Sequence, residues 1–155
     1  MTRRTTGKQS YTPQGQALAE LVGESVRLHG RLLAASDRMS RDLGLTGARW
    51  QVLSVVGGSP QPATISEVAR WMGLARQSVQ RIGDALYADG LVEYLPNPGH
   101  RRAQLVRLTA KGWALLARLD RRRYRWANEV AADLAKADLE AAARLLTTVR
   151  QRLGG

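Results

Sequence analysis

Residues 63–112 combine two helical patterns with an alternating pattern, and this order constrains the fold more than any other feature of the chain. Thr64 and Glu67 have the spacing of a capping box, which predicts that a helix begins there. Gly73 is expected to end that helix. Between these signals the apolar positions recur at helical spacing, at Ile65, Val68, Ala69 and Met72. A short helix that ends at a glycine and is followed by a second helix predicts a helix-turn-helix.

The second helix is predicted over residues 76–89, with one apolar and one polar face. Its apolar stripe consists of Val79, Ile82 and Leu86. Its polar face carries Gln77, Arg81 and Asp84, and its margins carry Arg76 and Gln80. Gln and Arg side chains can make paired hydrogen bonds to adenine and guanine edges in the major groove of DNA. This helix alone leaves two interpretations open, a DNA-reading face and an ordinary solvated face.

A hairpin is predicted directly after the second helix. Residues 91–94 alternate and favour a strand, residues 96–99 are turn formers, and residues 104–108 match a returning strand. The tip carries His100, Arg101 and Arg102, whose cationic side chains suit the minor groove or its flanking phosphates. Thr109 and Gly112 then begin the next helix. A basic hairpin after a helix-turn-helix favours the DNA-reading interpretation.

Four segments resemble the MarR family of bacterial winged-helix transcription regulators: GLTGARWQVL, ARQSVQR, DGLVEY and RRAQLVRLTAKG. The resemblance extends over residues 18–153. It implies an obligate homodimer that binds a pseudo-palindromic operator, usually as a repressor, and in many members leaves DNA when a phenolic or other aromatic ligand binds. It also implies that residues 76–89 form the recognition helix and that Arg101 is the wing arginine of an Asp-x-Arg motif. Two positions depart from the family pattern, since Gly99 replaces that Asp and Ala75 replaces the usual Ser cap.

The residues that we expect to contact double-stranded DNA form three groups. Bases are expected to be read by Gln77, Gln80 and Arg81. The wing is expected to contribute Arg101 and Arg102. Elements that border the DNA backbone carry the expected phosphate contacts, Thr46, Arg49, Arg70 and Arg76, and Ser78 lies in the same predicted interface.

The predicted fold class is mainly α with a small β-hairpin wing, a winged helix-turn-helix flanked by N- and C-terminal dimerisation helices. We expect a flexible basic arm over residues 1–10 and an N-terminal dimerisation helix over residues 11–42. The DNA-binding lobe is expected over residues 43–112, and the C-terminal dimerisation helices over residues 113–155.

Both ends of the chain carry apolar stripes that one small lobe would not bury. The stripes include Leu18 and Leu21 near the N-terminus, and Leu139, Leu145, Leu146 and Val149 near the C-terminus. A partner subunit is the expected cover, and an ordinary monomeric core is the alternative. A two-fold symmetric pair would also match a palindromic site.

Composition excludes several classes of protein. The chain of 155 residues has 24 basic and 13 acidic side chains, a net charge of +11 that favours a polyanionic partner. The absence of cysteine excludes disulfides, thiol-based sensing and Cys-ligated zinc. No catalytic constellation and no metal-binding cluster is apparent, so we expect neither an enzyme nor a cofactor. Without a signal peptide or a membrane-length apolar stretch, the chain is expected to be cytoplasmic and not to bind membranes.

Three questions stay open at the level of sequence. The regulator could be insensitive to ligands or an activator, and a nucleic-acid-binding protein without sequence preference would explain the charge equally well. The arginine run over residues 121–125 fits a solvated face, a DNA flank or a partner contact. By resemblance, a small aromatic effector would bind near Ser25, His29, Trp50 and Trp113, although such tryptophans are often plain core residues.

Overall fold

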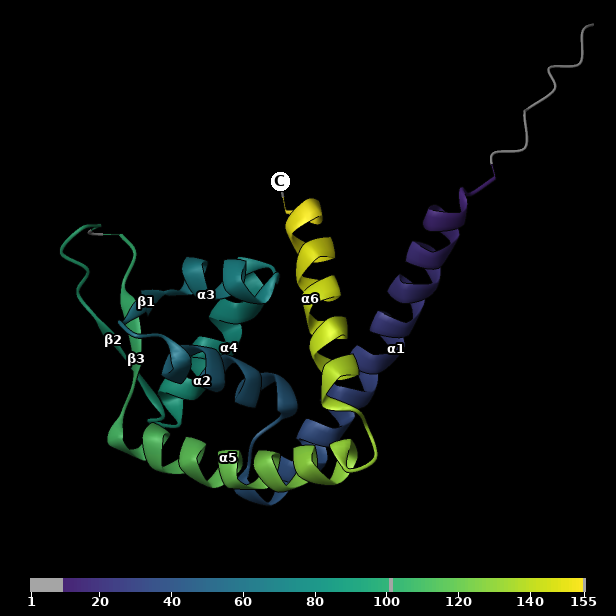
Figure 1. The fold of residues 1–155 in the computed structure, drawn as a ribbon. Coiled ribbons are helices and arrows are strands. Elements are labelled where there is room, and N and C mark those ends of the chain that lie inside the picture. The colour runs from purple at the N-terminus through teal and green to yellow at the C-terminus, as the bar shows by residue number, and fades with distance from the viewer. Residues whose placement is uncertain (1–9, 101, 155) are drawn as a thin grey trace, which may run out of the picture.

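A computed structural model describes residues 10–100 and 102–154. Most of the chain is helical, and three short strands form one small sheet (Figure 1). The elements in chain order are α1 (Pro13–Ser40), the 3-10 helix η1 (Arg41–Leu43), α2 (Gly47–Gly58), β1 (Ala63–Thr64), α3 (Ile65–Met72), α4 (Arg76–Ala88), β2 (Val92–Leu95), β3 (Leu105–Leu108), α5 (Ala110–Ala131) and α6 (Lys136–Leu153). The predicted fold class, a mainly helical chain with a β-hairpin wing, is confirmed.

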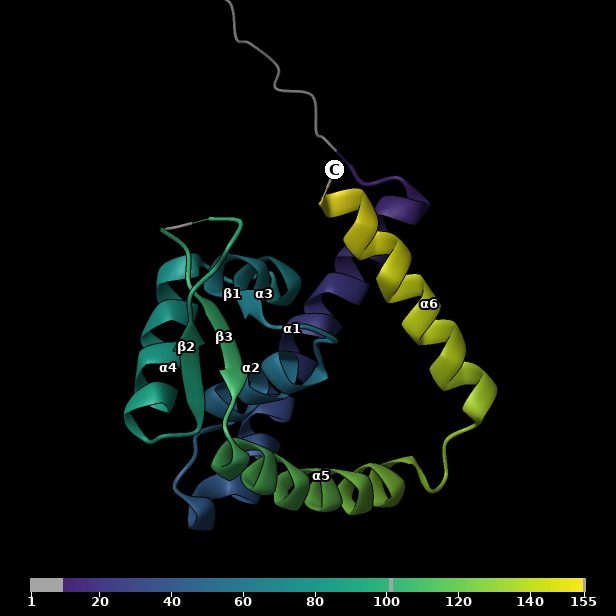
Figure 2. The ribbon, with the colours of Figure 1, turned by 90° about the vertical axis from the view of Figure 1, so that its left-hand side faces the viewer.

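The lobe formed by α2 to β3 holds the hydrophobic core. Buried side chains come from every element of the lobe and from α5, and the fully buried ones include Val52, Leu53, Val68, Val79, Leu86, Val92, Val106 and Leu119. Strand β3 lies in the centre of the antiparallel sheet, between β1 and β2. Figure 2 shows the β2–β3 hairpin beside α4, with its end projecting beyond α3 and α4. The core therefore holds the second helix of the helix-turn-helix and the wing in one rigid unit.

The predicted helix signals are present as caps. The Thr64 side chain accepts a hydrogen bond from the backbone amide of Glu67, and the Glu67 carboxylate accepts one from the amide of Thr64, so the capping box is complete. Gly73 ends α3 with a φ of 65°, a left-handed conformation that glycine adopts without steric cost. Thr109 caps α5 by accepting from the amide of Gly112. The helix-turn-helix and the start of α5 are confirmed.

Element boundaries differ slightly from those that the sequence predicts. Helix α1 begins at Pro13, whose fixed φ suits a first helical turn, and ends at Ser40 rather than at Asp42. Strand β2 lies one residue later than predicted, and β3 begins at Leu105. The sheet also contains β1, which the sequence analysis missed. Its two residues pair with β3, and two residues are too few to show an alternating pattern.

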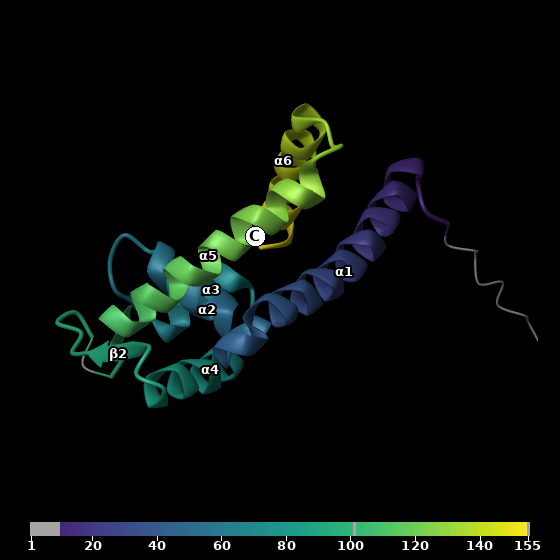
Figure 3. The same cartoon turned by 90° about the horizontal axis from the view of Figure 1, so that it is seen from below.

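The helices outside the lobe form two arms. Figure 3 shows α1 and the α5–α6 pair leaving the lobe as separate arms. The arms are joined near the lobe, where the Arg122 guanidinium donates to the carbonyl oxygen of Met39 at 2.5 Å and to both carboxylate oxygens of Asp42 at 2.5 and 2.7 Å. This pairing holds the pKa of Asp42 below its ordinary value. One member of the arginine run is thus an internal tie between α5 and the end of α1.

No helix among residues 10–100 and 102–154 combines the length and the apolar character needed to span a bilayer. Over the same ranges, no three His, Asp or Glu side chains gather in a way that would hold a metal ion.

Candidate nucleic-acid interface

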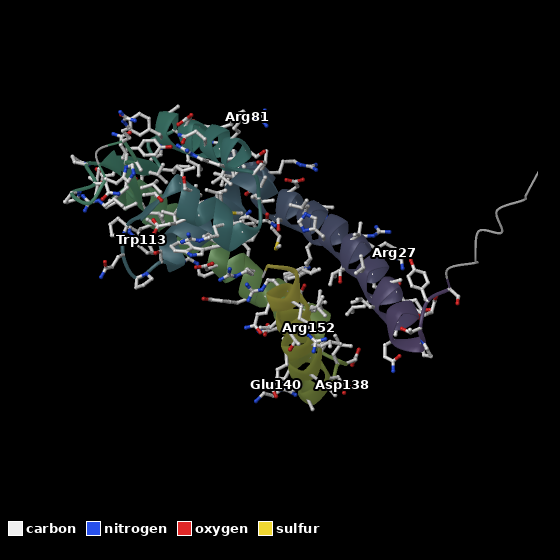
Figure 4. All side chains as sticks on the ribbon, turned by 90° about the horizontal axis from the view of Figure 1, so that it is seen from above. Arg27, Arg81, Trp113, Asp138, Glu140 and Arg152 are labelled. Carbon is white, nitrogen blue, oxygen red and sulfur yellow. The ribbon has the colours of Figure 1, made fainter. Side chains whose placement is uncertain are left out.

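Helix α4 separates a packing face from a polar outer face, as its sequence predicts. Val79 and Leu86 are fully buried against the core. On the opposite side Arg76, Gln77 and Arg81 are exposed, and Figure 4 shows Arg81 at the outer edge of the lobe. These side chains line a surface hollow together with Ala75, Ser78 and Gln80. The first two turns of α4 therefore present a continuous strip of hydrogen-bonding groups to solvent.

The N-terminus of α4 has no side-chain cap. Ala75 occupies the capping position, and the backbone amides of Ser78 and Val79 bond to its carbonyl oxygen at 3.0 and 3.2 Å. The earlier amides of the first turn have no side-chain acceptor. Such amides, at the positive end of the helix dipole, suit a phosphate oxygen.

Gln80 is less free than its neighbours on α4. Its amide nitrogen donates to Asp84 Oδ1 at 2.8 Å and to the Tyr94 hydroxyl at 3.3 Å, and Tyr94 donates to the same Asp84 oxygen at 3.1 Å. Burial and the neighbouring Asp84 carboxylate raise the pKa of Tyr94 to about 12. This network could not be predicted from the sequence, because Tyr94 lies on β2 and meets α4 only in the folded lobe.

The wing presents its cationic tip to solvent. His100 and Arg102 are exposed, while Arg101, the predicted wing arginine, lies outside the described residues. The turn is held by Asn97, whose side-chain oxygen accepts from the amide of Gly99 at 3.0 Å. Further down the hairpin, the Arg107 guanidinium pairs across the strands with Glu93 at 2.8 Å. The exposed Arg102 at the tip is therefore better placed to contact DNA than Arg107, which is already paired within the hairpin.

Among the predicted phosphate contacts, Arg49 differs from the expectation. Its guanidinium donates to the carbonyl oxygen of Ala85 at 3.2 Å and pairs with the Asp89 carboxylate, and its side chain is only 20% exposed. It therefore braces the C-terminal end of α4 from α2, so a phosphate would have to compete with these partners for its guanidinium. Arg70 at the end of α3 is exposed, as expected. Thr46 is also exposed, and its side chain caps α2.

A cavity of about 470 Å³ lies between the arms and the lobe. Of the four predicted effector contacts, His29 and Trp50 line it. Ser25 lines a neighbouring groove between α1 and α6 instead. Trp113 lines neither and is 52% exposed, and Figure 4 shows it at a different edge of the lobe from Arg81. Trp113 lies in the first turn of α5, away from this cavity.

Nine other residues that line this cavity were not predicted, and Met72, Arg123 and Trp126 are among them. Arg123 and Trp126 are three residues apart on α5 and so share a helix face, a signal that the dense arginine run conceals. The indole nitrogen of Trp50 is buried and has no hydrogen-bond partner among the described residues. The cavity thus combines aromatic walls with a cation, Arg123, which also pairs with Asp120 at 2.9 Å.

The apolar stripes of the arms face solvent in the isolated chain. Leu18, Leu139, Leu145 and Leu146 are 41–52% exposed, and α6 contains no buried residue. Leu21 and Val149 are half-buried where α1 and α6 line their common groove. Figure 1 shows α6 standing apart from the lobe. Exposed apolar side chains gathered on two helices are typical of a surface that a partner covers.

The chain is similar to known regulators over most of its length. A family profile described as MarR family matches residues 43–103. The uncharacterized protein Rv2011c of Mycobacterium tuberculosis is 38% identical over 105 residues, which are 68% of this chain and 72% of that protein. Among solved structures, the transcriptional repressor CouR, bound to a 23-mer DNA duplex, superimposes with a TM-score of 0.72 at 27% identity, covering 91% of this chain and 99% of that chain. Apo MarR from E. coli gives a TM-score of 0.66 at 25% identity, covering 91% of this chain and 98% of that chain.

Proposed function

This chain belongs to the MarR family of transcription regulators and carries its DNA-binding winged helix, and from this premise we propose that it is a homodimeric repressor. In this proposal it binds a pseudo-palindromic operator and leaves the operator when a small aromatic acid binds.

One observation carries the DNA-binding part of the proposal. Arg76, Gln77 and Arg81 project from the exposed face of a helix whose other face is fixed in the core. Arg81 and Gln77 are suited to guanine and adenine edges, and Arg76 lies at the uncapped N-terminus where a phosphate would sit. The exposed wing residue Arg102 supports a second contact beside the helix, in the minor groove or at its phosphates.

Selection of bound sequences from random DNA tests this function. We expect the wild type to enrich a palindrome with half-sites about one helical turn apart. Gln77→Ala and Arg81→Ala should each cost about 1 to 3 kcal/mol on the selected site and much less on random DNA. Equal losses on both would instead support a nucleic-acid-binding protein without sequence preference, the alternative that the net charge of +11 favours.

The apolar arms support the homodimer. The exposed leucines of α1 and α6 lie on helices that carry no part of the reading face. Covering them with a second copy would bury an apolar surface and set two reading helices in a two-fold arrangement. CouR, which is similar over 91% of this chain, is described as a repressor bound to DNA, and this supports the repressor role proposed here.

The cavity supports the effector. Trp50 and Trp126 provide aromatic walls, and Arg123, which pairs with Asp120 on the same helix at 2.9 Å, provides a cation for a carboxylate. The cavity lies between α1, α2, α3 and α5, so an occupant would contact both the arms and the helix-turn-helix through Met72. A ligand that fits one arrangement of arms and lobe better than another would shift the spacing of the reading helices.

Tryptophan fluorescence tests the effector. A Trp71→Phe, Trp113→Phe double variant removes the two exposed tryptophans and leaves Trp50 and Trp126 as reporters. Titration with benzoic and naphthoic acids should quench this fluorescence and release the operator, whereas the corresponding amides should bind more weakly. Arg123→Gln should remove the advantage of the acids over the amides. If the acids neither quench the tryptophan fluorescence nor release the operator, the protein is a regulator that is insensitive to such ligands.

A further inference from the structure

Tyr94 connects the wing to the recognition helix through two polar side chains. Its hydroxyl donates to Asp84 Oδ1 and accepts from the amide nitrogen of Gln80, at 3.1 and 3.3 Å. The Gln80 nitrogen also donates to Asp84 Oδ1, at 2.8 Å. The network therefore gives the amide nitrogen of a predicted base-reading residue two acceptors within the protein.

The chemistry of the network fixes which end of the Gln80 amide points inward. An ionised carboxylate only accepts hydrogen bonds, so Asp84 must face the nitrogen of Gln80 and the hydroxyl proton of Tyr94. The hydroxyl proton is then committed to Asp84, which leaves the Tyr94 oxygen to accept from Gln80. The Gln80 oxygen takes no part in these bonds, and it is the end that remains for another partner.

The fold makes room for this network at Gly83. A Cβ added to that buried glycine would lie 2.7 Å from the Tyr94 hydroxyl and 2.9 Å from Ile65 Cδ1. The Tyr94 ring is further held by Tyr87, whose ring centroid lies 5.5 Å away. With its pKa raised to about 12 by burial and by Asp84, Tyr94 keeps its proton at physiological pH.

We propose that Tyr94 is a specificity-determining positioning residue, which occupies the amide nitrogen of Gln80 so that Gln80 reads bases through its oxygen alone. The inference rests on the proposed function, in which Gln80 faces a base pair. In the major groove adenine and cytosine both present an amino group to an acceptor, whereas paired contact with adenine needs an acceptor and a donor. The wild type therefore accepts adenine or cytosine at the position that Gln80 reads.

Selection from random DNA with Tyr94→Phe tests this inference. The substitution removes the hydroxyl, and one amide hydrogen of Gln80 becomes available for N7 of adenine. We expect the preference for adenine over cytosine to rise roughly 3- to 10-fold at one symmetric pair of positions, about half the discrimination of a paired contact, with other positions unchanged. Tyr87→Phe is the matched control, because the exposed Tyr87 hydroxyl has no hydrogen-bond partner among the described residues.

A second comparison separates positioning from a general structural effect. In a Gln80→Ala background, Tyr94→Phe should leave the base preference unchanged, since no amide remains to be positioned. Thermal unfolding of each variant checks that the lobe is folded. The inference is overturned if Tyr94→Phe leaves the wild-type preference intact, alters affinity equally at all positions, or has the same effect without Gln80. If the wild type itself enriches no sequence, the proposed function fails together with this inference. If the wild type enriches a palindrome and Tyr94→Phe does not change the base preference, only this inference fails.

Discussion

Gly83 lies in the middle of the recognition helix, where glycine is less stable than alanine by about 1 kcal/mol. The structure supplies the reason, since the missing side chain is where the Tyr94 hydroxyl and the end of Ile65 lie. A residue that weakens its own helix thus allows that helix to pack closely against the wing and the preceding helix. The conformation of α4 at this point is ordinary, and the requirement is one of space alone.

Gly83→Ala is therefore expected to destabilise the protein although it improves helix propensity. The added methyl group would overpack the site at a cost of about 1 to 3 kcal/mol, against a gain of about 1 kcal/mol in propensity. Urea unfolding should show a net loss of about 1 kcal/mol. Gly58→Ala is the control, because nothing lies within 4 Å of a Cβ there, and it should be neutral or slightly stabilising. Equal behaviour of the two variants would contradict the steric explanation.

At the scale of residues, the sequence predicted exposure better than it predicted partners. Arg76, Gln77 and Arg81 are exposed as expected, because helical periodicity alone determines the face on which a residue lies. Arg49 and Gln80 also lie where expected, but Arg49 bonds to Ala85 and Asp89, and Gln80 bonds to Tyr94 as well as to Asp84. The Ala85, Asp89 and Tyr94 partners are 14 to 40 residues away in the sequence. Such pairings depend on tertiary packing, and no local pattern records them.

Elements with local stop and start signals were the most predictable. Helix α3 was predicted with both of its ends, because a capping box and a left-handed glycine are written in adjacent residues. Strand β1 has no such signal and depends on its partner β3, and for this reason it was missed. The wing was predicted as a hairpin, and its register was not, since register depends on cross-strand contacts.

The capping box of α3 should make the stability of the protein sensitive to acid. Hydrogen bonds from the backbone and side chain of Thr64 hold the pKa of Glu67 below the ordinary 4.5. A carboxyl with a lowered folded-state pKa contributes stability above pH 4.5, and this contribution is lost as the pH falls through the folded pKa. Glu67→Gln keeps a side chain that can complete the box but does not titrate. In urea unfolding below pH 4.5, the wild type should lose more stability than Glu67→Gln, and parallel losses would contradict this assignment.

In the wing, an exposed arginine should contribute more to DNA binding than an arginine that is already paired within the protein. Arg102→Ala removes an exposed cation at the tip and should flatten the salt dependence of operator binding by about one unit of slope. Arg107→Ala is the control of equal charge, because Arg107 already pairs with Glu93 and should contribute little to the slope. Arg101→Ala should behave like Arg102→Ala if Arg101 is the wing arginine. An unchanged slope in both tip variants would remove the wing from the interface.

At the scale of the whole molecule, the proposed dimer would use the exposed apolar arms to set the spacing of its two lobes. Leu145→Asp or Leu146→Asp would place an unpaired carboxylate in the proposed subunit interface, at a cost of several kcal/mol. Sedimentation should show a monomer, and operator binding should fail with it, because two half-sites must be held about one turn of DNA apart. Gln151→Asp on the opposite face of α6 carries the same charge change and should remain dimeric. A folded monomeric variant that binds the full palindrome as tightly as the wild type would refute this mechanism.

Helix α6 has 18 residues, none of them buried, and a lone helix of this length is only marginally stable in water. Under the proposed dimer, α6 completes its folding when a second copy arrives, so the amount of intact regulator depends on its own copy number in the cell. When monomers are scarce, doubling their number gives about four times as many dimers by mass action. A small change in gene dosage would thus cause a proportionally larger change in operator occupancy, even when no ligand is bound.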